Sequence, residues 1–203
     1  MQLKISSITN LTDARYFSAI GAQYLGFSFD VLNENNISIA KAKEIVGWLH
    51  EPVIIGEFGV HQTKEEIQFV AEEMPLNEIQ IPFSHAQKEE LDFDKFLVLD
   101  DWSLDISHWS SDYFVIKIKH QLLNEISRKA RNDDAGISEN LNSLQQFIKN
   151  NKVFIETDFT KENILPIIEN LNPFGIQITC RKEEKAGLSF VDEYAEIVEL
   201  IGF

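Results

Sequence analysis

Residues 3–29, LKISSITNLTDARYFSAIGAQYLGFSF, form the stretch that decides the fold. Leu3–Ile5 is a short apolar run that predicts a strand, and Thr12–Ile20 carries apolar residues at helical spacing. Tyr24–Phe29 is again a short apolar run of strand character. A strand, a helix and a second strand in this order are typical of a βαβ unit, in which the two strands run parallel.

The same alternation continues to the end of the chain. The further predicted strands are Val53–Phe58, Glu78–Ile81, Phe96–Leu99, Tyr113–Ile118, Val153–Ile155 and Phe174–Ile178. The further predicted helices are Ile39–Leu49, Thr63–Glu73, a short Trp102–Trp109, Ile137–Ile148, Lys161–Leu171 and Phe190–Ile201. Eight strands in alternation with these helices predict an α/β protein: a single (β/α)8 TIM barrel of parallel strands over residues 1–203, with a shortened fifth helix.

An open, doubly wound sheet is the alternative arrangement of the same elements. The first strand is not followed by a Gly-x-Gly-x-x-Gly turn, which weakens a dinucleotide-binding interpretation. Closure into a barrel removes the exposed strand edges, so the barrel is preferred. The polar stretch 128–136, RKARNDDAG, is expected to be a loop above the sixth strand, either a plain surface loop or a substrate lid.

Local signals mark several helix starts. Thr12 or Asp13 is a candidate cap of the first helix, and Thr160 of the seventh. Thr63 and Glu66 have the spacing of a capping box at the third helix.

Charge and cysteine content narrow the class of protein. The 203 residues carry a formal net charge of -15, which repels nucleic acid and anionic membranes but is also explained by solubility alone. No apolar run reaches the roughly 20 residues of a membrane span, and Met1–Ser7 has strand character rather than that of a signal peptide. The one cysteine, Cys180, excludes an internal disulfide and fits a reducing compartment. We therefore expect a cytoplasmic protein with neither nucleic acid nor membrane as partner.

Several segments resemble one known family. Lys4–Ala14, KISSITNLTDA, is similar to the opening of phosphoribosylanthranilate isomerase, which reads Lys-Ile-Cys-Gly-Ile-Thr with an Asp-Ala pair at the same offset. Further similar segments are Gly21–Phe29 (GAQYLGFSF), Ile79–Ile81 (IQI), Thr160–Ile164 (TKENI) and Pro173–Ile178 (PFGIQI). The matches follow the family's order over nearly the whole chain, with a weakly matching middle from about residue 83 to 144. The family acts in tryptophan biosynthesis.

The resemblance implies an Amadori rearrangement, which converts a phosphorylated aminoaldose into an aminoketose. In the family an acid opens the sugar ring, and a base removes a proton from the carbon beside the resulting Schiff base. The family's basic Cys corresponds to Ser6, and the Gly that follows it to Ser7. The family's acidic Asp corresponds to Lys117, or in another register to Lys119. A thiol can ionise near neutral pH, whereas an unassisted serine hydroxyl cannot.

The implied phosphate site also departs from the family pattern. Thr157-Asp158 stands where the family has Gly-Gly after the seventh strand, and an aspartate repels a phosphate. The family's arginine after the second strand is missing from Asn33–Asn36. Arg181 and Lys182 offer partial compensation because they can bind an anion directly. The ligand-binding candidates are Ser7, Gln80, Thr157, Asp158, Thr179, Cys180, Arg181 and Lys182.

Three hypotheses follow for the function. Because the base, the acid and the phosphate cradle are all substituted, the first is a pseudoenzyme that binds a small anionic ligand at the C-terminal mouth, or a regulatory barrel. The second is altered chemistry that uses Lys117, Asp158 or Asp100 at the mouth, including a Schiff base on Lys117. The third is the unchanged isomerase. A monomer or a homodimer fits each of them.

Metal chemistry and thiol chemistry are not expected. The spacing of the histidines matches no tight ligand motif, so we predict neither metal nor cofactor. His61 and His120 follow strands three and six and are expected in loops. Cys180 has no motif for a neighbouring base, so we expect it to be buried as a small apolar residue.

Overall fold

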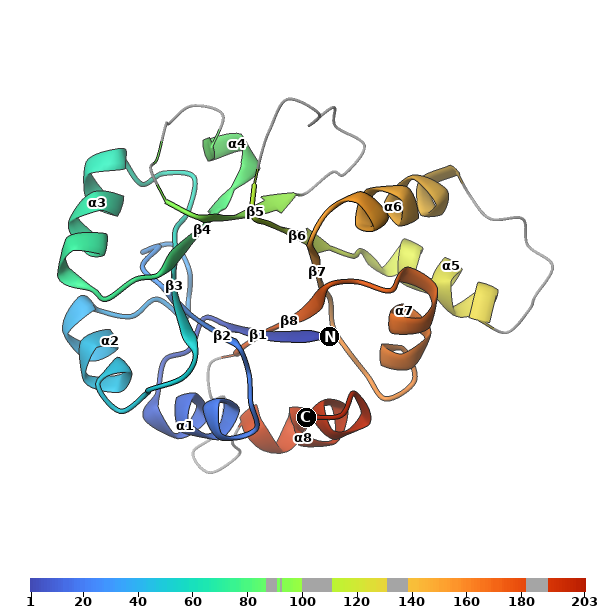
Figure 1. The fold of residues 1–203 in the computed structure, drawn as a ribbon, viewed down its shortest axis with the longest axis horizontal. Coiled ribbons are helices and arrows are strands. Elements are labelled where there is room, and N and C mark those ends of the chain that lie inside the picture. Colours follow the sequence, from blue (N-terminus) through green and yellow to red (C-terminus); the bar gives the residue numbers. More distant parts are fainter. Residues whose placement is uncertain (87–90, 92, 100–110, 131–138, 182–189) are drawn as a thin grey trace.

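The computed structural model describes residues 1–86, 91, 93–99, 111–130, 139–181 and 190–203. Eight parallel strands close into a barrel in the order β1 to β8, and the helices lie around the outside of this ring (Figure 1). The predicted (β/α)8 barrel is therefore confirmed, and the open-sheet alternative is wrong. Within the described part, no helix is long and apolar enough to cross a membrane.

The strands lie where the sequence predicts them, to within one residue at each end. They are β1 (Gln2–Ser6), β2 (Tyr24–Ser28), β3 (Val53–Glu57), β4 (Glu78–Pro82), β5 (Lys95–Leu99), β6 (Tyr113–Lys117), β7 (Val153–Glu156) and β8 (Gly175–Thr179). The barrel closes between β1 and β8, where Gln2 pairs with Gly175 and Ser6 with Thr179. Since all strands are parallel, their carboxyl ends form a single rim.

The helices differ from prediction after β4, where the sequence predicts none, and after β6. They are α1 (Leu11–Ala19), α2 (Ile39–Val46), α3 (Lys64–Glu73), α4 (Phe83–Ala86), α5 (His120–Ala130), α6 (Glu139–Asn150), α7 (Ile164–Leu171) and α8 (Phe190–Leu200). The expected fifth helix, Trp102–Trp109, and the tryptophans that flank it lie outside the described residues.

Two helices follow β6, of which α5 was not predicted. The loop expected at 128–136 is wrong for its first residues, because Arg128 lies within α5; residues 131–136 lie outside the described part. His120 begins α5 rather than a loop. Leu122 and Ile126 are four residues apart and buried, and α5 packs against both α6 and α7 (Figure 1). Polar residues around these two positions conceal the apolar face from a sequence pattern.

The helix caps match the sequence in part. Thr63 and Glu66 form the predicted capping box at α3. The cap of α1 is Asn10, whose side chain accepts from the backbone N–H of Asp13, so neither Thr12 nor Asp13 is the cap. At α7 the N-cap is Asn163 and not Thr160.

Aromatic side chains fill the amino-terminal half of the barrel. Tyr24 contacts Phe96 and Phe154 at ring-centroid distances of 5.3 and 5.6 Å, and Phe96 stacks on Tyr113 at 4.5 Å. Gly175 is needed beside them, because a Cβ there would lie 2.5 Å from the Phe154 ring. This interior core is packed, not a pore, and the two described cavities lie towards the carboxyl ends of the strands.

The strand phenylalanines divide between the two cores of the barrel. The sequence predicts that five phenylalanines within the apolar strand segments pack in the core, and all five are buried. Phe154 belongs to the interior cluster, whereas the others belong to the cluster between the sheet and the helices: Phe27, Phe29, Phe58 and Phe114.

A half-buried carboxyl group lies at the amino-terminal start of β4. One oxygen of Glu78, Oε2, is buried and has no hydrogen-bond partner within the described part of the chain. Burial raises the pKa of Glu78 from its ordinary 4.5 to about 7, and the charges of Asp94 and Asp112 add to the rise. The folded barrel therefore prefers the protonated form of this group.

Replacing Glu78 should change how stability depends on pH. Because the folded pKa is raised, the native state holds the proton more tightly than the unfolded chain, and stability falls as pH rises from about 4.5 to about 7. We expect Glu78→Gln to equal the parent protein near pH 4 and to exceed it near pH 8. After screening of a partly exposed group, the expected gain is about 1 kcal/mol. Urea denaturation at both values measures it, with the exposed Glu65→Gln as control. The same difference in unfolding free energy between variant and parent at pH 4 and at pH 8 would contradict a raised pKa of Glu78.

Candidate functional site

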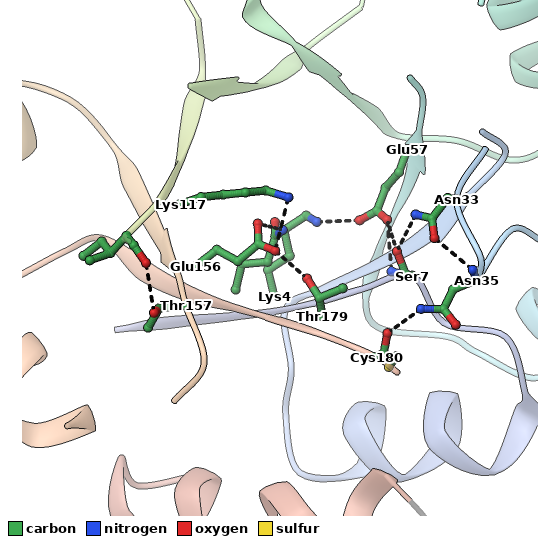
Figure 2. Close-up of polar contacts among 12 residues, drawn as sticks. Lys4, Ser7, Asn33, Asn35, Glu57, Lys117, Glu156, Thr157, Thr179 and Cys180 are labelled. Atoms are coloured by element: carbon green, nitrogen blue, oxygen red, sulfur yellow. Dashed lines mark hydrogen bonds and ion pairs between the residues drawn. The ribbon is translucent and has the colours of Figure 1, made fainter. Parts of the chain in front are cut away.

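Polar side chains gather where the strands end, at the mouth of the barrel (Figure 2). An inner cavity of about 180 Å³ lies directly above the packed interior. A larger cavity of about 600 Å³ adjoins it over the loops that follow β2, β7 and β8. The residues that line both are Asn33, Lys117, Glu156 and Thr179.

A buried ion pair lies beneath the inner cavity. Lys4 of β1 has no exposed surface, and its Nζ lies 2.7 Å from Oε1 of Glu57, at the end of β3 (Figure 2). Gly26 of the intervening β2 leaves the space for this carboxylate, since a Cβ there would lie 2.0 Å from the same oxygen. A glycine in the middle strand thus lets two charges meet across the barrel interior.

Ser7 ties the first loop to the same carboxylate. Its backbone lies in the left-handed region, with φ of 58°, where the family resemblance places a glycine. This conformation is unfavourable for a side-chain-bearing residue. Its N–H and Oγ both donate to Glu57 Oε2, at 3.0 and 3.2 Å, which compensates for the strain. Asn33 donates in turn to Ser7 Oγ at 3.4 Å.

Glu156, at the end of β7, is the second carboxylate of the mouth. It accepts from Gln177 Nε2 at 2.9 Å and from Thr179 Oγ1 at 2.8 Å. Lys117 Nζ lies 3.5 Å from it, farther than in a short charge-assisted hydrogen bond. The Lys117 side chain is 54% exposed, against 14% for Glu156. The carboxylate is therefore held firmly by neutral donors and loosely by its cation.

The loops after β7 and β8 are closed by their own side chains. Arg181 forms an ion pair with Asp158, and the Asp158 carbonyl accepts from Asn163 Nδ2 at 2.9 Å. Thr157 Oγ1 donates to the carbonyl of Ile118 at 3.1 Å. This is the region where the resemblance places a phosphate cradle, and here an exposed aspartate faces the outer cavity.

Cys180 is buried, as the sequence predicts, with 2% of its surface exposed. Burial raises the pKa of its thiol well above the ordinary value, and the charges of Asp13 and Glu57 act in the same direction. The thiol is therefore protonated at neutral pH. Its carbonyl accepts from Asn35 Nδ2 at 2.7 Å, which fixes the loop after β2 against the end of β8.

The structure brings nearly all the candidate residues of the sequence to this mouth. The inner cavity is lined by Ser6, Ser7, Gln80, Lys117 and Thr179, and the outer one by Lys117, Thr157, Asp158, Thr179, Cys180 and Arg181. Lys182 and Asp100 lie outside the described residues. Across the described part, no group of three or more His, Cys, Asp or Glu side chains is arranged to hold a metal ion.

Sequence reasoning missed Lys4 and Glu57. Each interrupts an apolar strand with a single charge: Lys4 stands between Leu3 and Ile5, and Glu57 precedes Phe58. A charge in a buried strand requires a partner, so these two residues of opposite sign were a readable signal. Gln177 was quoted in a matching segment but was not identified as a site residue.

The fold and the polar mouth define this protein as a (β/α)8 barrel with a candidate small-molecule site at the carboxyl ends of its strands, where such barrels bind their ligands. No protein-family model matches the chain. A 90-residue segment, 44% of the chain, is 37% identical to N-(5'-phosphoribosyl)anthranilate isomerase of Bacillus cereus (strain G9842) and covers 42% of that protein. The matched segment thus spans less than half of this relative.

Solved structures show the same fold over nearly the full length. A phosphoribosylanthranilate isomerase in complex with reduced 1-(o-carboxyphenylamino)-1-deoxyribulose 5-phosphate has a TM-score of 0.75 at 17% identity, covering 98% of this chain and 97% of that one. The isomerase of Thermotoga maritima has a TM-score of 0.73 at 19% identity, with the same coverage. The isomerase of Thermus thermophilus has a TM-score of 0.71 at 19% identity, covering 98% of this chain and 100% of that one. Together with the motifs, these likenesses confirm the resemblance to the phosphoribosylanthranilate isomerase family.

Removing the cation from the buried pair should destabilise the barrel strongly. Lys4→Met leaves the Glu57 carboxylate buried without its counter-ion, which costs about 3–5 kcal/mol of unfolding free energy. The double variant Lys4→Met/Glu57→Gln should recover much of this loss, because no uncompensated charge remains. Urea denaturation measures both.

The matched control is Lys41→Met, which breaks an exposed pair with Glu44 and should cost less than about 1 kcal/mol. A double variant as unstable as Lys4→Met alone would contradict an electrostatic origin of the effect.

Proposed function

We propose that this chain is a phosphoribosylanthranilate isomerase-like barrel that binds a small anionic molecule at its mouth and does not catalyse the family's Amadori rearrangement. One observation carries the proposal. At the end of β6, where the resemblance places the catalytic acid, Lys117 points into the mouth and pairs with Glu156 (Figure 2).

The base position supports the same conclusion. Ser6 is 3% exposed and lies at the end of β1 beside the inner cavity. A serine hydroxyl acts in proton transfer only when an adjacent base activates it. The residue after it, Ser7, also differs from the family pattern, and its side chain and N–H both donate to Glu57. The mouth therefore offers a hydroxyl where the rearrangement needs a group that ionises.

The contacts of the other groups at the mouth do not suit them to replace the missing acid and base. Glu156 accepts hydrogen bonds from Gln177 and Thr179 and forms a longer ion pair with Lys117, so its oxygens serve as acceptors. The ion pair with Glu156 engages the charged form of Lys117, whereas a Schiff base requires the neutral amine. The burial of Cys180 keeps its thiol protonated. These contacts weigh against altered chemistry on Lys117 as well.

Two cations support the binding of an anion in the outer cavity. The side chains of Lys117 and Arg181 are 54% and 55% exposed and line this cavity together. Each is paired with a carboxylate, but exposed ion pairs contribute only about 0–1 kcal/mol. A phosphate or carboxylate ligand can therefore compete for them at a modest cost.

The cytoplasmic location and the monomeric or homodimeric state stay predictions. One of the solved relatives is described as dimeric, that of Thermotoga maritima.

The purified protein should not isomerise phosphoribosylanthranilate. Incubated at micromolar concentration with this substrate, it should form no aminoketose above the uncatalysed rate, whereas the Bacillus cereus relative assayed in parallel should convert it. The reason is the simultaneous loss of a thiol base and a carboxylic acid from a cooperating set, of which one loss alone can remove most of the catalysis. Detection of ketose product, or growth of a tryptophan-requiring strain lacking the isomerase, would overturn the proposal.

Anion binding should respond to the charges of the outer cavity. Inorganic phosphate, titrated by NMR at low salt, should bind weakly, with a dissociation constant on the order of millimolar for so small a ligand. Arg181→Gln should weaken this binding several-fold, and Asp158→Asn should strengthen it because it removes a repulsive charge and releases Arg181.

The exposed Arg15→Gln, on α1 away from the mouth, is the matched control and should leave phosphate binding unchanged. Equal affinities in all four proteins would contradict an anion site at this cavity.

A further inference from the structure

We propose that the inner cavity binds the ammonium group of a hydroxylated small molecule, such as an amino alcohol or an amino sugar. This inference deepens the proposed binding function, on which it rests, because it names the chemical group that enters the innermost part of the same site.

The wall of the inner cavity is predominantly negative. Asp30, Glu57 and Glu156 line this cavity, and among the described lining residues Lys117 is the one cation. Lys4 neutralises Glu57 from below but is completely buried. An anion entering the inner cavity would therefore meet uncompensated negative charge, whereas a cation would be attracted.

Glu156 can accept more hydrogen bonds than it does. A carboxylate offers about four lone-pair sites, and here neutral donors occupy two of them, Gln177 Nε2 and Thr179 Oγ1. Lys117 stands 3.5 Å away on a half-exposed side chain. This contact is longer than the roughly 2.7–2.9 Å that charged partners prefer, so the remaining lone pairs of Glu156 can accept a shorter bond from a ligand ammonium.

Two buried amides, in addition to the carboxylates, provide hydrogen-bond acceptors at the inner cavity. Gln80 and Gln177 line the inner cavity and are 9% and 1% exposed. The side-chain oxygen of each has no hydrogen-bond partner within the described residues. A buried acceptor left without a donor is unfavourable, so both amides would gain from a hydrogen-bond donor that a ligand brings to this wall.

The hydroxyl groups of the wall complete the chemistry. Ser6, Ser7, Ser28 and Thr179 line the cavity, and hydroxyls both donate and accept. They suit the hydroxyl groups of a polyol next to the ammonium. The outer cavity, with Lys117 and Arg181, then faces the other end of the molecule.

The experiment compares three small molecules of matched size by NMR titration at low salt: 2-amino-1,3-propanediol, glycerol and glycerate. The ammonium compound should bind roughly tenfold tighter than glycerol, because charge-assisted hydrogen bonds are about twice as strong as neutral ones. Glycerate should be excluded from the inner cavity. Binding of glycerol as tight as that of the ammonium compound, or shifts of the inner-cavity residues by glycerate alone, would overturn the inference.

Variants assign the effect to Glu156. Glu156→Gln should abolish the preference for the ammonium compound while leaving or strengthening phosphate binding, since Lys117 is then released. Lys117→Met should tighten the binding of the ammonium compound, because the Lys117 ammonium no longer competes for Glu156. The exposed Glu65→Gln is the matched control and should change neither.

The two proposals fail in different ways. If phosphate binds and responds to Arg181 and Asp158 while the ammonium compound does not bind, the inference fails and the anion site stands. An unchanged ammonium preference in Glu156→Gln would likewise reject the inner site, whatever the phosphate result. Turnover of phosphoribosylanthranilate would remove the proposed function but would leave the ammonium preference to be decided by the titration.

Discussion

The ion pair between Lys4 and Glu57 is the constraint on which the mouth of this barrel depends. Two opposite charges are buried together, so neither can be removed without leaving the other in a poorly polarisable environment. The pair fixes β1 against β3 across Gly26, and through Glu57 it holds the backbone of Ser7 in its left-handed conformation. The floor of the inner cavity and the shape of the first loop therefore have one common origin.

Below this pair the barrel is filled, and above it the barrel is polar. The rings of Tyr24, Phe96 and Phe154 pack against one another and leave no passage through the interior. The aromatic core supplies stability, while the carboxyl ends of the strands carry side chains that satisfy one another. Such a division is inherent in a closed parallel barrel, because all carboxyl ends open on the same side.

The mouth differs in charge from what the family resemblance implies. The group at the end of β6 is a cation, the loop after β7 carries Asp158, and Glu156 and Glu57 add negative charge to the wall. Both exposed cations described at the rim, Lys117 and Arg181, form ion pairs with carboxylates, so a ligand competes with these pairs. An amphoteric small molecule matches this pattern better than a compound with phosphate and carboxylate groups alone, since each end then finds a partner of opposite sign.

The sequence by itself determined the order and the bounds of the eight strands, because a buried parallel strand is a short apolar run that needs no knowledge of its neighbours. It also placed Ser6, Lys117 and Asp158 at one rim, since each lies at the end of a strand or within two residues of it. The sequence did not reveal helix α5, because an apolar face carried by few residues is recognisable only when α6 and α7 are there to cover it. Only the tertiary structure decided which charges meet: Lys4 and Glu57 are 53 residues apart, and their pairing follows from the closure of the barrel.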